Sequence, residues 1–409
     1  MDDDALSPEM ARWLVGATGR DAVSAARRWH DEGRDELRVA EGLRQELGLD
    51  PASAGAAHTA AVLQVRAVAA GHPDGWLWTR SGLEQASHPL VAEWRARRYA
   101  GAPAVVDLTV GCGADARELA EHAPTVGCDL DPARLVLAQA NLAGRVPVVR
   151  ADATRPAVGA TVWRWADPSR RAGGRRLRGL DAAQPPLSSL LGEAPAGVAV
   201  SPAVDLADPA LPVDAELEFL QVGPRLVEAA VWTGTLRDRA GAGRATRSAT
   251  ILTPDGAPAH LRGTPTGELA GRVRTPTIGQ VLVLPAPALV RARLHEAMAA
   301  ALDLDRVSRR RALFLADAAP APTPWLGVEV IASVTSTGAR HLRRALTDLS
   351  VDEIEVLTHG VDTRPADLLR AMGSPPTGPH GHRIHLVRTD GGAVAVVTSP
   401  GPLPNDGAA

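Results

Sequence analysis

Apolar residues recur at intervals of three and four along the N-terminal part of the chain, and this spacing is typical of helices that bury one face. Val39 and Leu43 are one such pair. Pro8 directly follows Ser7, and a serine cap followed by proline is a common way for a helix to begin. The pattern predicts a helical region over residues 1–98 that leads into the rest of the chain.

After residue 103 the pattern changes to short apolar runs, each with an acidic residue at or near its end. Strands are predicted for four of these runs, at residues 104–108, 125–129, 146–152 and 161–167. Helical or loop segments separate them, and strands that alternate with helices indicate a parallel, doubly wound α/β sheet. Such sheets bind ligands at the carboxyl ends of their strands, so we expect the middle third of the chain to carry the active domain. Further strand-like runs at 197–201, 217–222 and 227–232 are candidates to complete the sheet.

The last part of the chain predicts a second, smaller fold. Residues 235–280 are rich in Gly, Arg, Thr and Pro and are interpreted as hairpins and loops. One helix is expected from Leu289 through Leu302. From Gly327 onward the pattern reads strand, helix, strand, helix, strand, which predicts a small α/β module.

Length and charge narrow the classes of function. The 409 residues indicate two or three domains. With 44 basic and 47 acidic residues the net charge is -3, so no general positive field attracts a polyanion, and any nucleic-acid contact has to be local. The chain contains no lysine, which excludes Schiff-base chemistry and a lysine general base.

Two further observations concern where the protein works. Cys112 and Cys128 are the only cysteines, too few for a disulfide framework or a closed cysteine zinc site, so a reducing compartment is expected. The acidic start of the chain does not look like a secretory signal, and charged residues interrupt the long apolar stretches. We therefore expect a cytoplasmic protein with no membrane span.

Candidate ligand contacts follow the first three predicted strands. Gly111 and Gly113 come just after Asp107, at the turn from a strand into a helix, where glycines let a ligand approach the backbone closely. Tight packing alone explains such a turn equally well. Asp129 ends the next strand about twenty residues later, where a carboxylate can accept both hydroxyls of a nucleoside ribose. Asp152 follows the third strand and is placed to accept a hydrogen bond from an adenine amino group, with a solvated strand-end aspartate as the alternative.

The fourth strand ends at Asp167 and Pro168, where the crevice meets the reacting face of a bound cofactor. A nicotinamide dinucleotide is expected to need a third glycine, but Ala114 stands in that place. S-adenosylmethionine fits better, because it carries no phosphate and its cationic groups suit an acid such as Asp107. We interpret Asp167 and Pro168 as the catalytic turn, which accepts a hydrogen bond from a nitrogen nucleophile and orients its lone pair.

Several motifs, namely DLTVGCGAD, GCDLDP, ADPSRR, LTHGVDTRPADLLR and the lesser match GLEQASHP, resemble those of a known family. The chain is similar to class I S-adenosylmethionine-dependent methyltransferase-like proteins that carry a C-terminal THUMP-like domain. The resemblance implies a Rossmann-like α/β sheet and S-adenosylmethionine as cofactor. It also implies cofactor contacts from Asp107, Gly111, Gly113, Asp129 and Asp152, and an acceptor site lined by Asp167 and Pro168.

The resemblance extends over most of the chain and suggests a domain division. Residues 1–98 would be the N-terminal helical region and 99–255 the Rossmann-like methyltransferase domain. Residues 256–326 would be a connecting segment, and 327–400 would form the THUMP-like domain.

Arginines crowd the stretch after the fourth strand, and the candidates for substrate binding are Arg170, Arg171, Arg175 and Arg176. Guanidinium groups suit phosphate oxygens, so RNA is a candidate partner. A solvated basic loop paired with acids elsewhere is the equally weighted alternative. His380, His382 and His385 have a spacing that suits a metal, but no nearby acid completes a site, and no metal is expected.

These observations predict an S-adenosylmethionine-dependent methyltransferase that acts on RNA or another nitrogen nucleophile. The alternative is a catalytically inactive methyltransferase-like protein that serves as a nucleic-acid or protein binding module. The turn at residues 109–114 motivates this alternative, because Thr109, Val110 and the pair Gly113, Ala114 stand where the family that the chain resembles usually has cysteine and a double glycine.

Overall fold

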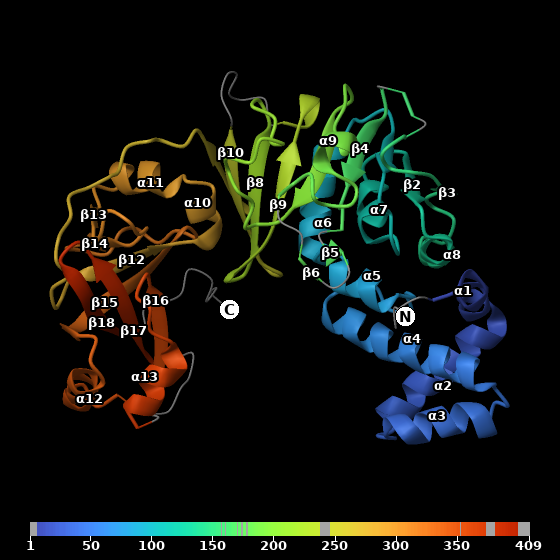
Figure 1. Cartoon of the computed structure of the whole chain (residues 1–409), viewed down its shortest axis with the longest axis horizontal. Coiled ribbons are helices and arrows are strands. Elements are labelled where there is room, and N and C mark those ends of the chain that lie inside the picture. Colours follow the sequence, from blue (N-terminus) through green and yellow to red (C-terminus); the bar gives the residue numbers. More distant parts are fainter. Residues whose placement is uncertain are drawn as a thin grey trace. The chain divides into compact units, whose positions relative to one another are not determined.

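The structure of the protein is a computed structural model, and it describes residues 6–156, 158–159, 161–169, 171–172, 175–176, 179–237, 246–351, 353–373 and 381–399. The chain forms two compact units. The first contains Met1–Glu216 and Val227–Arg244, and the second contains Leu217–Leu226 and Ala245–Ala409. Figure 1 labels their helices and strands.

The first unit begins with six helices: α1 (Pro8–Val15), α2 (Ala17–Asp31), α3 (Glu36–Gln45), α4 (Pro51–Ala69), α5 (Arg80–Gln85) and α6 (Pro89–Ala96). The predicted start of the first helix is confirmed, because the Ser7 side chain accepts a hydrogen bond from the Met10 N–H at 3.1 Å and Pro8 stands in the first turn. Among the described residues, no helix is long and apolar enough to cross a membrane.

The sheet of the first unit contains β1 (Val105–Asp107), β2 (Thr125–Asp129), β3 (Val148–Arg150), β4 (Trp163–Ala166), β7 (Ala196–Val200) and β9 (Arg225–Trp232). These strands lie in the order β9-β7-β4-β1-β2-β3. Strand β1 is parallel to both β2 and β4, β2 is parallel to β3, and β4 is parallel to β7. Strand β9 runs antiparallel to β7. The predicted parallel α/β sheet is thus confirmed, with one antiparallel strand at its β9 side.

Two helices follow the first two strands, α7 (Ala114–Leu119) after β1 and α8 (Pro132–Asn141) after β2. Helix α1 lies beside α8 (Figure 1), and apolar side chains of the N-terminal helices share one core with α7 and α8. Asn141 fastens this contact, because its side chain accepts from the Leu77 N–H at 2.8 Å and donates to the carbonyls of Leu77 and Cys112 at 2.9 Å. The N-terminal helices are therefore packed onto the helical layer that covers the sheet.

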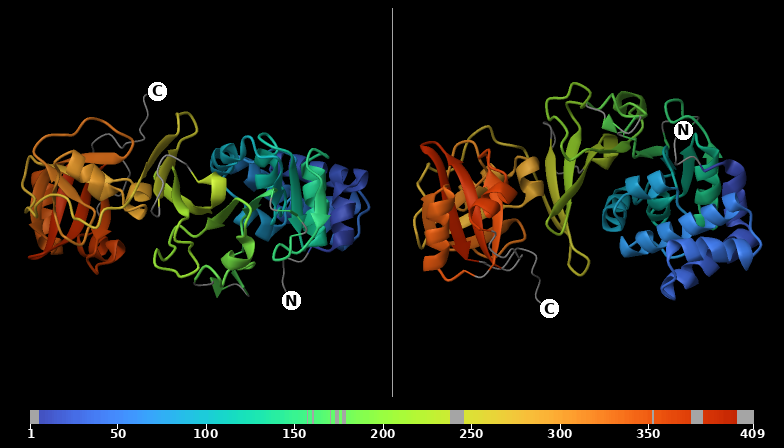
Figure 2. Two further views of the ribbon diagram at one scale, coloured as in Figure 1. Left: turned by 90° about the horizontal axis from the view of Figure 1, so that it is seen from above. Right: turned by 60° about the horizontal axis from the view of Figure 1, so that its bottom comes forward.

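The second unit begins with three paired strands, β8 (Glu216–Val222), β10 (Arg247–Leu252) and β11 (Ala259–Gly263). Strand β10 is parallel to β8 and forms an antiparallel pair with β11, which confirms a hairpin within the stretch 235–280. Its larger sheet consists of β12 (Val281–Pro285), β13 (Asp305–Arg306), β14 (Phe314–Ala316), β15 (Leu326–Ser336), β16 (Ile354–His359), β17 (His382–Thr389) and β18 (Gly392–Ser399). These strands, coloured orange to red in Figure 2, lie in the order β13-β14-β12-β15-β18-β17-β16.

The predicted order of the C-terminal module is confirmed by β15, α12 (Ala339–Asp348), β16, α13 (Pro365–Ala371) and β17. One more strand, β18, follows and pairs antiparallel with both β15 and β17. Strands β12, β13 and β14 belong to the same sheet, although they come from the stretch 256–326.

The prediction of one helix from Leu289 through Leu302 is wrong. The structure has two short helices instead, α10 (Pro287–Arg291) and α11 (His295–Ala301). Between them the backbone of Arg293 has a φ of 58°, in the left-handed region that an α-helix cannot contain. The apolar spacing continues across this break, so the periodicity alone does not reveal it.

A buried polar cluster lies in the larger sheet of the second unit. Glu329 on β15 is 3% exposed, and its carboxylate lies 2.6 Å from Arg383 Nη1, 2.7 Å from His385 Nε2 and 2.5 Å from the Thr398 hydroxyl. Burial alone would raise the pKa of Glu329, but the hydrogen bonds and charge of His385, with the bonds from Thr398 and Arg383, outweigh it and lower this pKa to about 2. The carboxylate therefore stabilises the folded state in its charged form.

We predict that Glu329→Gln lowers the free energy of unfolding of the protein by about 3 kcal/mol at pH 7, because it removes the buried carboxylate partner of Arg383 and leaves only the more exposed Glu355. The folded-state pKa of Glu329 lies below its ordinary value of 4.5, so its contribution is present above pH 4.5 and is lost as the pH falls through about 2. Urea unfolding at pH 7 and pH 3 measures both effects.

Glu355→Gln is the matched control, because Glu355 also binds Arg383, at 2.8 Å, but is 41% exposed. Its removal is expected to cost at most about 1 kcal/mol. Equal losses in the two variants would show that burial of the Glu329 cluster contributes nothing.

Candidate functional site

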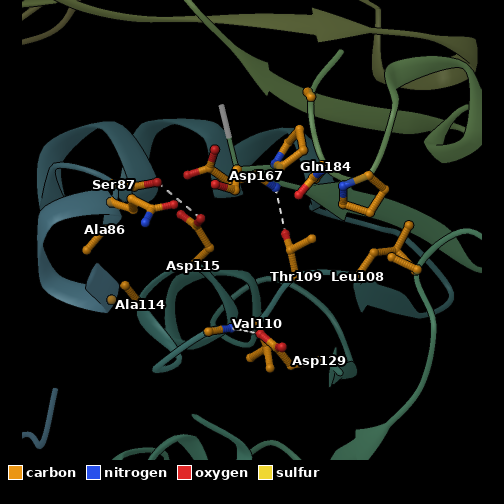
Figure 3. Close-up of a pocket in the computed structure, with 18 of the residues that line it drawn as sticks. Ala86, Ser87, Leu108, Thr109, Val110, Ala114, Asp115, Asp129, Asp167 and Gln184 are labelled. Atoms are coloured by element: carbon orange, nitrogen blue, oxygen red, sulfur yellow. Dashed lines mark hydrogen bonds between the residues drawn. The ribbon is translucent and has the colours of Figure 1, made fainter. Parts of the chain in front are cut away.

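A cleft of about 1210 Å³ opens at the carboxyl ends of the strands of the first unit. Five of the residues singled out from the sequence line it: Gly111, Asp129, Asp152, Asp167 and Pro168. Figure 3 shows Asp129 and Asp167 in this cleft with Thr109 between the two strand ends. Parallel pairing of β2, β1 and β4 brings these residues together, because their ends meet at one edge of the sheet.

The turn between β1 and α7 is held by Asp129. The Gly111 N–H donates to Asp129 Oδ2 at 3.1 Å, and the Asp131 N–H donates to Asp129 Oδ1 at 2.9 Å. A carboxylate has about four acceptor positions, so Asp129 keeps capacity for further donors such as ribose hydroxyls. Val110 adds a second hydrogen bond between this turn and β2, because its N–H donates to the Cys128 carbonyl at 2.8 Å.

Gly113 has a φ of 102°, and a Cβ at this position would lie 3.1 to 3.3 Å from the side chain of Leu142. Only glycine suits this position, for a backbone reason and a packing reason together. Gly113 precedes the first residue of α7 and is not among the residues that line the cleft. Its predicted contact with the cofactor remains a prediction.

Asp107, also predicted to contact the cofactor, lies below the floor of the cleft. It is 1% exposed, and its Oδ1 accepts from the Thr109 N–H at 3.1 Å. Burial raises the pKa of Asp107 well above its ordinary value, and the charges of Asp115, Asp129 and Asp167 raise it further. A cation bound above it would favour its charged form.

Thr109 links the glycine turn to the end of β4. The Asp167 N–H donates to the Thr109 hydroxyl oxygen at 2.7 Å, across 58 residues of sequence. Figure 3 shows this bond beside the cleft. Because Thr109 lies between Asp107 and the glycines, this hydrogen bond adds to the pairing of β1 with β4 in setting where the acceptor turn stands relative to the cofactor turn.

Asp152 lies at an exposed edge of the cleft. Its Oδ1 accepts from the N–H and the hydroxyl of Thr154 at 2.9 and 2.8 Å. These bonds lower the pKa of Asp152, so the group is a carboxylate and an acceptor at neutral pH. This suits the predicted bond from an amino group.

The predicted substrate-binding arginines are only partly described. Arg170 lies outside the described residues, as do the side chains of Arg171, Arg175 and Arg176. The backbone of the last three forms a short antiparallel pair, β5 (Arg171–Ala172) with β6 (Arg175–Arg176). The RNA contact assigned to these arginines stays a prediction.

The remaining candidates from the sequence are the histidines, considered as metal ligands, and the two cysteines, of which Cys112 lines the cleft. His380 lies outside the described residues, whereas His385 is fully buried against Glu329. No cluster of metal-ligating side chains occurs in the part of the chain that the structure describes. Cys112 and Cys128 are buried free thiols, and burial raises the pKa of each to about 11, which excludes an activated thiolate at neutral pH.

Sequence reasoning missed four residues on one side of the cleft. Ser87, Asp115 and Glu228 line it, and the guanidinium of Arg95 lies directly behind them. Figure 3 shows Ser87 and Asp115 joined by a hydrogen bond of 3.1 Å. A glutamate inside the apolar run of β9 was a signal for Glu228, because an acid rarely lies in a buried strand without a partner.

The class of the protein follows from the fold and the cleft. The chain is similar to a candidate methyltransferase from Porphyromonas gingivalis W83 whose crystal structure has been solved, with a TM-score of 0.74, 17% identity, and coverage of 93% of this chain and 98% of that one. This likeness confirms the expected Rossmann-like class I fold.

No family model matches the chain. It is 32% identical over 343 residues to an uncharacterized S-adenosylmethionine-dependent methyltransferase of Mycobacterium tuberculosis, known from strains CDC 1551 / Oshkosh and ATCC 25618 / H37Rv. The match covers 79% of this chain and 88% of the relative. The chain belongs to the S-adenosylmethionine-dependent methyltransferases, and the cofactor expected from the sequence is the methyl donor of this family.

We predict that Thr109→Val weakens S-adenosylmethionine binding about tenfold, because the Asp167 N–H loses its acceptor, worth about 1 to 2 kcal/mol, and the loosened turn has to be ordered again when the cofactor binds. Thr109→Ser keeps the hydroxyl and is the control, expected to bind like the unaltered protein. Isothermal calorimetry measures both. Equal affinities for the valine and serine variants would mean that this hydrogen bond does not organise the site.

Proposed function

We propose that this methyltransferase transfers the methyl group of S-adenosylmethionine to a nitrogen nucleophile, with RNA as the preferred acceptor. One observation carries the proposal: Asp167 stands at the end of β4, on the same cleft as Asp129 and the glycine turn. A donor seated at Asp129 and an acceptor at Asp167 would therefore share one cavity.

We assign the donor to the half of the cleft formed by the ends of β1, β2 and β3. Asp129 would accept the ribose hydroxyls, and Asp152 would accept from the adenine amino group. The acids that line the cleft, with Asp107 buried beneath its floor, would stabilise the charge of the cationic methionine portion. The acidity of this region supports a cationic donor over a phosphate-bearing one.

The chemistry asks little of the protein beyond alignment. The nitrogen lone pair forms a bond to the methyl carbon while the carbon–sulfur bond breaks, and the sulfonium leaves as a neutral thioether. Holding the two molecules in line supplies most of the acceleration. The Asp167 carboxylate would accept a hydrogen bond from the nitrogen and take its proton, or pass it to solvent, as the new bond forms.

One argument supports RNA. The β5 and β6 arginines follow Asp167 within a few residues, and guanidinium groups bind phosphate oxygens in pairs.

We also propose that residues 327–400 form the THUMP-like domain, since β15, α12, β16, α13, β17 and β18 make up an α/β module there. The division at 1–98, 99–255 and 256–326 is part of the same proposal.

We propose a cytoplasmic location, because both cysteines are free thiols, which a reducing compartment preserves. The alternative of a catalytically inactive binding module is not favoured. Relatives that match most of the chain are named as methyltransferases, and the altered glycine turn still borders an open cleft.

We predict that Asp167→Asn lowers the rate of methyl transfer about a hundredfold, because the amide cannot take the proton of the acceptor, while S-adenosylmethionine binding is retained. Radiolabelled S-adenosylmethionine incubated with cellular RNA, protein and small-molecule fractions measures transfer and identifies the acceptor.

Asp181→Asn is the control. Asp181 also lines the cleft, but its carboxylate accepts the Ser188 N–H at 2.8 Å and caps a local turn. This variant is expected to transfer methyl groups at the unaltered rate. Label in protein rather than RNA would contradict the RNA acceptor, and unchanged turnover of Asp167→Asn would contradict the assigned role of Asp167.

A further inference from the structure

Arg95 is the main counter-charge behind the acidic side of the cleft. This α6 side chain is 2% exposed, and its Nη2 lies 2.5 Å from Asp115 Oδ1 and donates to the Ser87 hydroxyl at 2.7 Å. Its Nη1 pairs with Glu228. The guanidinium therefore ties together α6, the first turn of α7 and strand β9.

The same guanidinium also touches the strand that ends at the acceptor turn. Its central carbon lies 4.2 Å from the ring centre of Trp165, which precedes Asp167 by two residues on β4. Burial opposes the charge of Arg95, but Asp115, Glu228 and Asp167 outweigh this effect and hold the pKa of Arg95 above its ordinary value. Arg95 is thus charged, and acids from α7, from β9 and from the turn after β4 stabilise its charge.

Asp115 and Glu228 line the cleft, whereas Arg95 does not. Their side chains are 13% and 9% exposed, so water alone stabilises their charges poorly. Asp107 and Tyr99 lie near the same group and are buried, and they supply no positive charge. Without the guanidinium, Asp115 and Glu228 would each lose the cation that they bind, and taking up a proton would relieve the cost of the unpaired negative charge.

We propose that Arg95 is a positioning residue of the methyltransferase site: its guanidinium fixes the carboxylates of Asp115 and Glu228, each beside a positive charge, on the wall of the cleft that faces the reacting groups. The inference rests on the proposed function, because it assumes that S-adenosylmethionine binds in this cleft. It adds that Arg95 fixes these acids in the free protein, before a cationic donor binds.

Arg98, three residues further along the chain, provides a matched control. It also pairs with a buried acid, Glu216, at 2.8 and 2.9 Å, and lies 4.6 Å from the ring centre of Trp232. Neither Arg98 nor Glu216 lines the cleft. The two arginines therefore have the same kind of structural role, but only Arg95 contacts residues of the site.

The experiment measures protons exchanged when S-adenosylmethionine binds. Calorimetric titrations at pH 7 in phosphate and in Tris, which differ in ionisation heat, give this number for the unaltered protein, Arg95→Met, Arg95→Lys and Arg98→Met. Arg95→Met is expected to release about one proton more than the unaltered protein, because the cationic donor expels the proton that the acids have taken up. Its affinity is expected to fall about tenfold, since the wall is no longer fixed.

Arg95→Lys keeps the charge without the planar fork, so its proton count is expected to return to the unaltered value while its affinity stays reduced. Arg98→Met is expected to lower the melting temperature and to leave both the proton count and the affinity unchanged. Should Arg95→Met not fold, Arg95→Lys carries the test through its affinity.

The inference is overturned if Arg95→Met exchanges as many protons as the unaltered protein, if Arg98→Met shifts the count equally, or if Arg95→Lys binds with unaltered affinity. The same titrations distinguish a failure of this inference from a failure of the proposed function. If the unaltered protein itself does not bind S-adenosylmethionine, the proposed function fails, whereas normal binding with no effect of Arg95 removes only the role of this residue.

Discussion

The parallel pairing of β1 with its two neighbours is the constraint on which the site depends. Val105 and Asp107 lie opposite Thr125 and Gly127 on one side, and β4 lies in the matching register on the other. This arrangement puts three strand ends next to one another. Each end carries an aspartate, and the three aspartates are far apart in the sequence. The glycine turn then crosses the carboxyl end of β1 and contacts Asp129.

The chemistry of the cleft is set by an excess of carboxylates over cations. Asp115, Asp129, Asp167 and Glu228 face or border it, and Arg134 is the one arginine among the described lining residues. Carboxylates crowded together repel one another, so the arrangement is stable only with a compensating cation. Arg95 supplies part of that charge from behind, and a sulfonium donor would supply more from within. The same excess of negative charge favours a cationic donor over a phosphate-bearing cofactor in the donor half of the cleft.

Strands β1, β2, β3 and β4 of the first unit could be predicted because each is a short apolar run with an acidic residue at or near its end. Asp129 and Asp167 could be predicted for the same reason, since they end such runs. The role of Arg95 could not, because its partner Glu228 lies 133 residues away and no local pattern records that contact. Local patterns also failed at Arg293, where a left-handed backbone divides an apparently continuous helix, and at β18, which adds a strand to the predicted C-terminal module.

The most direct test of the central claim is a crystal structure of the protein with S-adenosylhomocysteine, the product that keeps the nucleoside of the donor. The account predicts that the ribose hydroxyls bind the Asp129 carboxylate and that the thioether sulfur points toward Asp167. A nucleoside bound away from the ends of β1, β2 and β4, or a cleft closed by its own side chains at saturating ligand, would contradict it.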